Sequence, residues 1–331
     1  MDLSPLTDTS GALTHPVVRV VAVAAGSGIV VGLLASVVLA KRRPALARDI
    51  RIRTLTWIAL ALITLIPVVA TRLSAILLFG VLSLLCYREF ARATGLFRWR
   101  LVSAIVALGI VLVTAANLDH NPGALTLLTA VVPVSIIALS VLQDTPTGYI
   151  QRCALGVSAF FLFGMGMGRL GAMAAQPDYR ALLCTVIFCC QLSDVAAYCC
   201  GKSIRSRHLF PSTSPNKTLA GHAGALLVIT PIAAVLYHLS FRGTPLQAWH
   251  HCLILGLLTA ALAQLGDLVI SSVKRDLGIK DMGGDLPGHG GVLDRCNSLL
   301  LAAPAVYHYI TCVSGPSTAV PVRLLSSTIL P

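Results

Sequence analysis

The sequence predicts an all-α, polytopic integral membrane protein with about ten transmembrane helices. Of its 331 residues, 56% are hydrophobic and only 11% are charged, whereas about a quarter of an average soluble domain is charged. The mean hydropathy is +0.83. Apolar runs of roughly 20 residues, long enough to cross a bilayer as helices, recur along the whole chain. An ordinary soluble fold is therefore excluded.

The apolar runs and the charged breaks between them define the expected spans. They are 17–40, 55–70, 73–87, 101–118, 124–142, 153–175, 181–200, 222–240, 250–272 and 299–315. Pro67 and Arg72 mark the break between the second and third spans, because a charge there must reach an interface. Lys41, Arg42 and Arg43 follow the first run in place of a small-residue cleavage site, so we expect that run to remain as a membrane anchor.

Three regions are expected along the chain. Residues 1–150 form N-terminal transmembrane helices, and 151–315 form a catalytic transmembrane region that carries a charged, glycine-rich loop. The segment 316–331, rich in Ser, Thr and Pro, is expected to be a flexible tail. No internal repeat suggests the inverted halves common in transporters.

The distribution of positive charge predicts the orientation. The net charge of +12 does not indicate nucleic acid as a partner, because the basic residues lie in short loops between apolar runs. Most of the 25 lysines and arginines fall in loops on one side of the membrane, which the positive-inside rule assigns to the cytoplasm. We expect an inner, cytoplasmic membrane protein whose loops 201–218 and 273–298 share the cytoplasmic face.

The segment 271–298 holds the densest charge and glycine in the chain. Its charged residues are Lys274, Arg275, Asp276, Lys280, Asp281, Asp285, Asp294 and Arg295. This composition suits a site that gathers phosphates and a divalent cation beside a bilayer. The cations Lys274, Arg275 and Lys280 would neutralise a nucleotide triphosphate or a lipid phosphate. The alternative is ordinary snorkelling to the interface.

Two acids flank the glycine-rich loop. Asp267 lies well inside the ninth span, with Ser271 on the same helical face, and a carboxylate in hydrocarbon needs a cation or a metal as its partner. Asp294 follows beyond the loop. If the loop folds back, Asp267 and Asp294 can bind one or two Mg²⁺ ions. The alternative is that Asp267 only pairs with a Lys or Arg of a neighbouring helix.

The loop itself offers an anion cradle. Gly290 and Gly291 permit positive φ angles and let backbone N–H groups approach a phosphate. His289 can orient a phosphate or accept a proton. A single histidine in a turn is, however, more often structural.

A second group of polar residues surrounds the loop 201–218. Asp194 lies in an apolar span, Lys202 follows that span, and Ser214, Lys217 and Thr218 precede the next one. Hydroxyl and ammonium donors next to a helix N-terminus suit an anion. The alternative for this segment is a helix cap with a snorkelling lysine.

The order of these motifs resembles the phosphatidate cytidylyltransferase (CDP-diacylglycerol synthase) family. The resemblance is strong over roughly 190–310 and weak before. Its longest part is Ser271-x-Val273-Lys274-Arg275-x4-Lys280-Asp281-x-Gly283-x2-Leu286-Pro287-x-His289-Gly290-Gly291-Val292-x-Asp294-Arg295. The blocks 193–202 and 214–221 resemble those that precede this signature, and Arg88-Glu89-Phe90 resembles a short motif of the N-terminal half.

The resemblance implies a nucleotidyltransferase that transfers CMP from CTP to phosphatidic acid, giving CDP-diacylglycerol and pyrophosphate. It implies Mg²⁺, with K⁺ as a second candidate cofactor, membrane lipids as partners and a homodimer as a candidate assembly. The implied catalytic residues are Asp267, Lys274, Arg275, Lys280, Asp281, His289, Asp294 and Arg295. The implied substrate-binding residues are Asp194, Lys202, Ser214, Lys217, Thr218, Gly290 and Gly291. Asp267 and Asp294 are the implied metal ligands.

One position departs from the family pattern. Asn297 stands where the family usually has aspartate, and an amide supplies no negative charge although its carbonyl can still ligate. An inactive homologue is therefore one alternative, and a nucleotidyltransferase for another lipid phosphate, such as a polyprenyl phosphate, is a second. An anion transporter that uses Asp194 and Asp267 for coupling is a third, but its charges should follow a path through both leaflets.

Overall fold

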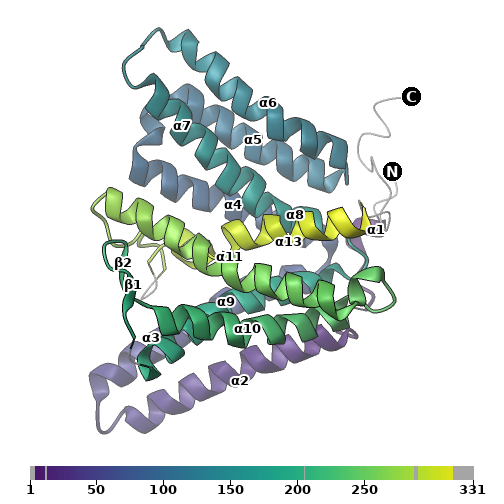
Figure 1. Cartoon of the computed structure of the whole chain (residues 1–331), viewed down its shortest axis with the longest axis vertical. Coiled ribbons are helices and arrows are strands. Elements are labelled where there is room, and N and C mark those ends of the chain that lie inside the picture. Colours follow the sequence, from purple (N-terminus) through teal and green to yellow (C-terminus); the bar gives the residue numbers. More distant parts are fainter. Residues whose placement is uncertain (1–3, 12, 205, 287–289, 316–331) are drawn as a thin grey trace.

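The protein is a bundle of long helices whose axes run roughly together (Figure 1). The computed structural model describes residues 4–11, 13–204, 206–286 and 290–315. The long helices are α2 (Pro16–Leu39), α3 (Pro44–Ala70), α4 (Arg72–Thr94), α5 (Arg100–Leu118), α6 (Pro122–Ser140), α9 (Tyr179–Ser203), α10 (Leu219–Ser240) and α11 (Trp249–Asp276). A further span is a continuous run of α7 (Tyr149–Ala159), the π-helical η3 (Phe160–Met167) and α8 (Gly168–Met173).

Short elements fill the connections and the two ends of the described chain. They are α1 (Ser4–Thr7), η1 (Leu96–Arg98), η2 (Val141–Gln143), η4 (Pro245–Gln247), α12 (Leu293–Cys296) and α13 (Leu299–Ser314). Two short strands, β1 (His208–Phe210) and β2 (Ser214–Thr218), form an antiparallel hairpin between α9 and α10.

The all-α membrane architecture is confirmed. Within the described residues, nine helices are long and apolar enough to cross a membrane, and α13 is a shorter apolar helix at the tenth predicted span. The second span starts earlier than predicted, because α3 continues through the basic segment Arg48–Arg53. Arginine favours helices, and its charge is exposed here, so the apolar count alone missed this first part of α3.

Local capping explains how the second and third spans separate. Pro67 lies inside α3, and the helix ends at Ala70. Thr71 then begins α4 with a capping box, in which its side chain and that of Ser74 each bond to the other's backbone N–H. Reciprocal capping satisfies the free N–H groups of the new helix, so the chain reverses within one residue.

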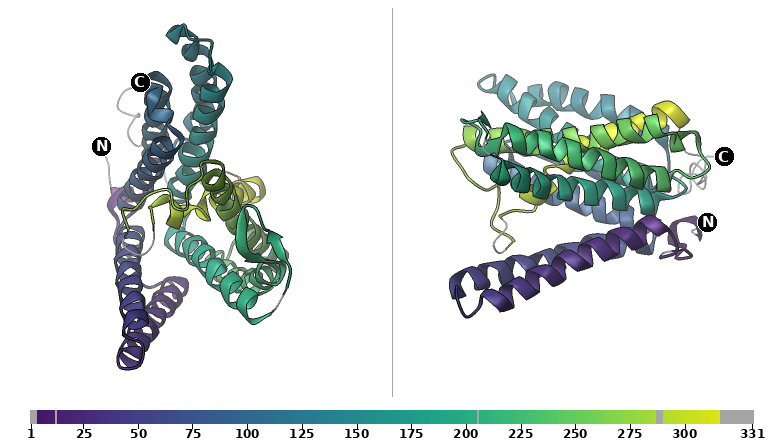
Figure 2. Two further views of the ribbon diagram at one scale, coloured as in Figure 1. Left: turned by 90° about the vertical axis from the view of Figure 1, so that its left-hand side faces the viewer. Right: turned by 60° about the horizontal axis from the view of Figure 1, so that its bottom comes forward.

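Three layers make up the bundle. The α2–α3 hairpin lies along one side, α9, α10, α11 and α13 lie in the middle, and α4 to α8 lie on the other side (Figures 1 and 2). In the most apolar 18-residue stretch of α2 only 11% of the residues are buried, and the same holds for α3. In the α7–α8 span the corresponding share is 61%. The hairpin therefore presents most of its apolar surface outward, as expected of helices in lipid.

The charged loops gather at one end of the bundle. The α2–α3 turn, the α6–α7 connection, the β-hairpin and the C-terminal end of α11 all lie on the left in Figure 1. The loops 201–218 and 273–298 thus share one face, as predicted. Core packing between the helices fixes their mutual position.

Candidate active site

The carboxylate of Asp267 lies at the centre of a group of polar side chains from separate elements. Helix α11 carries Asp267, and Lys217 of β2 forms an ion pair with it. The side-chain amide of Asn297 donates to Asp267 Oδ1 over 2.6 Å. The side chains of Asp267 and Lys217 are 20% and 21% exposed, so a polar ligand can reach them. Asp267 does pair with a lysine, as the alternative predicts, but it also accepts a hydrogen bond from Asn297.

A second acid joins this group from α9. The Ser298 hydroxyl donates to Asp194 Oδ2 over 3.2 Å, and the Ser298 N–H donates to Asn297 Oδ1 over 2.8 Å. Asp194, Asp267, Asn297 and Ser298 are named the acid cluster below. Two carboxylates thus lie close together, with Lys217 and Arg295 as the neighbouring cations.

Close backbone packing brings α11 to the segment that carries Asn297. Gly266 precedes Asp267, and a Cβ at this glycine would lie 2.5 Å from the carbonyl oxygen of Asn297. A side chain would force the two segments apart. The absence of a Cβ therefore allows the hydrogen bond between Asn297 and Asp267.

Asp294 organises the glycine-rich loop. Its carboxylate forms an ion pair with Lys274 over 2.8 Å, and the two side chains are 3% and 11% exposed. The backbone N–H groups of Met282 and Gly291 donate to Asp294 Oδ2 over 2.9 and 3.0 Å. Gly290 has a φ of +77°, which glycine adopts without strain. Asp294 thus holds both ends of the loop against α11.

Glu89 is a site residue to which sequence reasoning gave no role. It lies on α4, is 4% exposed, and accepts hydrogen bonds from the N–H groups of Val292 and Leu293 at 2.8 Å each. These donors lie at the N-terminus of α12, where a carboxylate is favoured. The sequence feature that could have indicated this residue is the motif Arg88-Glu89-Phe90. In the structure Glu89 joins α4, in the N-terminal half of the chain, to the end of the glycine-rich loop.

The two predicted metal acids belong to adjacent but separate hydrogen-bond sets. Asp294 bonds to Lys274 and to the loop backbone, whereas Asp267 contacts Lys217 and Asn297. The short helix α12 connects the sets, because Asn297 follows Asp294 by one turn. The roles of both acids stay predictions.

The other predicted cations and acids of the loop differ in burial. Arg275, Lys280 and Asp281 are exposed, and none of them forms an ion pair with a residue that the structure describes. Arg295 is partly buried beside the acid cluster. His289 lies outside the described residues.

The predicted residues of the loop 201–218 divide between structural and site positions. Thr218 caps α10 by accepting from the Gly221 N–H over 3.2 Å, as the capping alternative predicts. Ser214 pairs with Phe210 in the hairpin. Lys202 is exposed, with Nζ 3.3 Å from the Tyr198 hydroxyl. The β-hairpin thus positions Lys217 beside Asp267 of the acid cluster.

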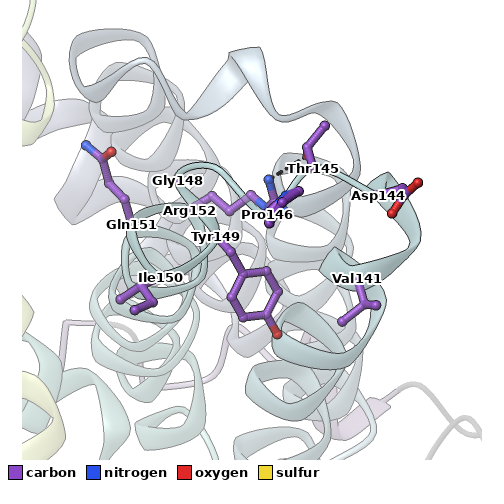
Figure 3. A pocket seen from close by; sticks show the side chains of 9 residues that line it. All are labelled: Val141, Asp144, Thr145, Pro146, Gly148, Tyr149, Ile150, Gln151 and Arg152. Atoms are coloured by element: carbon purple, nitrogen blue, oxygen red, sulfur yellow. Dashed lines mark hydrogen bonds between the residues drawn. The ribbon is translucent and has the colours of Figure 1, made fainter.

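A pocket of about 810 Å³ at the α6–α7 connection contains none of these residues. Its lining includes Asp144, Tyr149 and Arg152 (Figure 3). Arg152 is 1% exposed and donates to Thr145 Oγ1 over 2.8 Å and to the Ser140 carbonyl over 3.2 Å. These bonds give Arg152 a structural role in holding the connection.

The donors of the acid cluster fit a hard divalent cation. Carboxylate, amide carbonyl and hydroxyl oxygens are the ligands that Mg²⁺ prefers, and Mg²⁺ usually keeps several waters beside one or two carboxylates. No cluster of three or more His, Cys, Asp or Glu that could hold a metal occurs within the described residues, so an ion here would complete its shell with substrate or water.

Comparison with known proteins places the chain in a family. A model of the cytidylyltransferase family matches residues 51–313. A phosphatidate cytidylyltransferase of Bacillus subtilis is 27% identical over 278 residues, which cover 80% of this chain and 99% of that protein. Another from Staphylococcus aureus is 29% identical over 261 residues, or 77% of this chain and 96% of that protein. YnbB of Escherichia coli, an uncharacterised protein, is 35% identical over 179 residues, or 51% and 57%. The family match spans most of the sequence, from the first third of α3 to α13, and the chain therefore belongs to the cytidylyltransferase family.

Proposed function

We propose that this protein is a phosphatidate cytidylyltransferase that transfers CMP from CTP to phosphatidic acid. The observation that carries the proposal is the acid cluster, held beside the loop of Asp294 at one end of a membrane bundle. The names of the Bacillus and Staphylococcus relatives supply the substrate.

The reaction forms one bond and breaks another at phosphorus. An oxygen of the phosphatidate head group attacks the α-phosphorus of CTP, the bond to the β-phosphate bridging oxygen breaks, and pyrophosphate leaves with that electron pair. Phosphatidate is already an anionic nucleophile near neutral pH, so no strong general base is needed. The main tasks are to align two anions and to offset their repulsion.

The residues of the chain suit these tasks. Asp194 and Asp267 would hold Mg²⁺, which when bound neutralises phosphate charge and stabilises the departing pyrophosphate. Lys217 positions the Asp267 carboxylate through their ion pair. Arg275 and Lys280 are exposed at the same end of the protein and are available to bind the triphosphate.

Asp294 and Glu89 have positioning roles in this proposal. Both carboxylates accept bonds from backbone N–H groups of the glycine-rich loop. They fix the described ends of that loop, at Met282 and at Gly291 to Leu293, before substrate binds, which lowers the ordering cost of each turnover.

The membrane side is part of the proposal. The turn Lys41–Arg43 and the exposed cations of loops 201–218 and 273–298 lie at the end that carries the acid cluster. The positive-inside rule assigns such loops to the cytoplasm, where CTP is made available.

The experiment uses purified full-length protein in detergent with CTP, Mg²⁺ and phosphatidate. We expect release of pyrophosphate together with formation of CDP-diacylglycerol, and loss of both in Asp294→Ala. Arg207→Gln is the matched control, because Arg207 is an exposed cation of the adjacent hairpin loop. ATP and UTP in place of CTP test the base. Product formation that is undiminished in Asp294→Ala contradicts the assigned role, and no product with CTP contradicts the proposed activity.

A further inference from the structure

A cavity of about 400 Å³ lies between the α2–α3 hairpin, α4, α9 and the loop beside α12. We name it the hairpin cavity, and define it by Gly28, Trp57, Ala61, Phe188, Leu192 and Leu299 among its lining residues. Its volume is in the range of small-ligand sites. Most of its lining residues belong to α2, α3 and α9, which are three of the helices long and apolar enough to cross a membrane; Figure 2 shows how the α2–α3 hairpin lies against the rest of the bundle.

The long walls of the hairpin cavity are apolar. Two hydroxyls line it, but both are used within their own helix, since Thr54 donates to the Ile50 carbonyl over 2.9 Å and Thr64 to the Leu60 carbonyl over 2.7 Å. Bonded in this way, they offer no strong donor to a ligand. The walls therefore suit a hydrocarbon chain and not a nucleotide or a sugar.

One end of the hairpin cavity is polar and adjoins the acid cluster. Gln191 and Arg295 line it there, and Gln191 Nε2 donates to the Arg295 carbonyl over 3.1 Å. Arg295 Nε is buried and has no hydrogen-bond partner among the described residues. Asp194 follows Gln191 by three residues on α9, and Ser298, in the turn that follows α12, donates to Asp194 over 3.2 Å. An anionic group bound by Arg295 would thus lie next to the acid cluster.

The tip of the α2–α3 hairpin carries a dense positive charge. Its exposed cations are Lys41, Arg42, Arg43, Arg48, Arg51 and Arg53. Within the described residues, the one ion pair in this segment joins Arg53 to Asp49 over 3.0 Å. A polybasic segment next to a membrane attracts anionic lipids. The positive charge at the tip suits the phosphate head group of a lipid, and the apolar walls of the hairpin cavity suit its hydrocarbon chain.

We infer that one acyl chain of the lipid substrate binds in the hairpin cavity with its phosphate at Arg295, so that the α2–α3 hairpin selects the substrate by its chain. The inference rests on the proposed function and deepens it. Helix α2 lies before the region matched by the family model, which begins at residue 51. The wall formed by α2 thus lies outside the matched region.

Two glycines of α2 provide a matched test. A Cβ at Gly28 or at Gly26 would meet no atom within 4 Å, so a side chain can start at either position without a clash at its first carbon. Gly28 lines the hairpin cavity and Gly26 does not. Gly28→Trp should fill the cavity, and Gly26→Trp should not.

The assay compares a long-chain and a short-chain substrate. We expect Gly28→Trp to raise KM for dioleoyl phosphatidate by about tenfold, the loss of affinity that corresponds to displacing about two buried methylenes. KM for dihexanoyl phosphatidate, whose chains reach less of the cavity, should change little. Gly26→Trp should alter neither value. Equal effects of the two variants, or equal effects on the two lipids, overturn the inference.

A binding measurement separates this inference from the proposed function. Wild-type protein that makes no product from any phosphatidate contradicts the proposed function, and labelling then decides the inference alone. A phosphatidate with a photoreactive diazirine at the end of one acyl chain should label peptides that contain Trp57 and Phe188, and Gly28→Trp should suppress this labelling. Labelling spread evenly over the outward faces of the helices, or unchanged in Gly28→Trp, overturns the inference.

Discussion

Asn297 donates a hydrogen bond from its side-chain amide to the carboxylate of Asp267 over 2.6 Å, at the position where the family pattern usually has an acid. An aspartate there would face Asp267 as a like charge. The amide thus lets the two segments meet through a hydrogen bond and without like-charge repulsion.

Replacing Asn297 with Asp should make the folding stability depend more on Mg²⁺ and should make the acid cluster bind Mg²⁺ more tightly. Three carboxylates would then meet, and like charges at this distance disfavour each other. We expect a lower melting temperature than wild type in EDTA, and half-maximal activity at about tenfold less Mg²⁺, because affinity rises with ligand charge. Thermal unfolding and activity measured across a Mg²⁺ titration check this. Identical titrations for the two proteins contradict it.

Removing the charge of Lys217 should impair catalysis. Lys217→Gln leaves Asp267 without its cation, and loss of a charged hydrogen bond costs about 1.5–3 kcal/mol, or roughly 10- to 100-fold in kcat/KM. Arg207→Gln, which removes an exposed cation from the same hairpin loop, should keep the wild-type rate. Similar losses in both variants would point to a general effect of surface charge.

Glu89→Gln should reduce activity, although Glu89 lies on α4, about 200 residues before the glycine-rich loop in the sequence. A glutamine side chain has one acceptor oxygen, so one of the N–H groups of Val292 and Leu293 loses its partner. We expect about a 10- to 100-fold loss of kcat, with a lower melting temperature. Arg88→Gln is the control, because the ion pair of the neighbouring Arg88 within the described residues is an exposed 3.6 Å contact with Asp285. Full activity in Glu89→Gln would contradict a positioning role.

Folding stability should fall in acid because of His120, at the α5–α6 connection. Burial lowers the pKa of His120 to about 4, from 6.5. The unfolded chain binds a proton first as the pH falls, so stability from neutral His120 is complete above about pH 6.5 and is lost towards pH 4. His120→Asn keeps a residue that tolerates the positive φ of 49° and removes the titration. The melting temperature of this variant should depend less steeply on pH, and parallel curves would contradict the assignment.

The long helices could be predicted because each must present a continuous apolar surface to lipid. All ten predicted spans coincide with helices, and the charged break at Arg72 lies where α4 begins. The start of α3 was missed, because residues 44–54 are helical without being apolar. The β-hairpin was missed as well, since its two short strands carry no alternating apolar pattern.

The composition of the site could be predicted, but its pairing could not. Charge density identified Asp267, Asp294, Lys217 and Lys274 as candidates, and the fold brings them together in two pairs. Which cation meets which acid depends on how the loop folds back over α11, and sequence spacing does not fix this. Glu89 reaches Val292 from another part of the chain, a contact that no local pattern could indicate.

The rate of CDP-diacylglycerol formation by Asp267→Asn, relative to wild type, tests the central claim most directly. The substitution keeps the size of the side chain and its contact with Asn297 while removing the charge that the acid cluster would offer to Mg²⁺. Measured with saturating CTP, Mg²⁺ and phosphatidate, the rate should fall by about 100-fold or more, with the folded fraction unchanged. A variant that forms product within about twofold of the wild-type rate, at every Mg²⁺ concentration, would contradict a role for the acid cluster in nucleotidyl transfer.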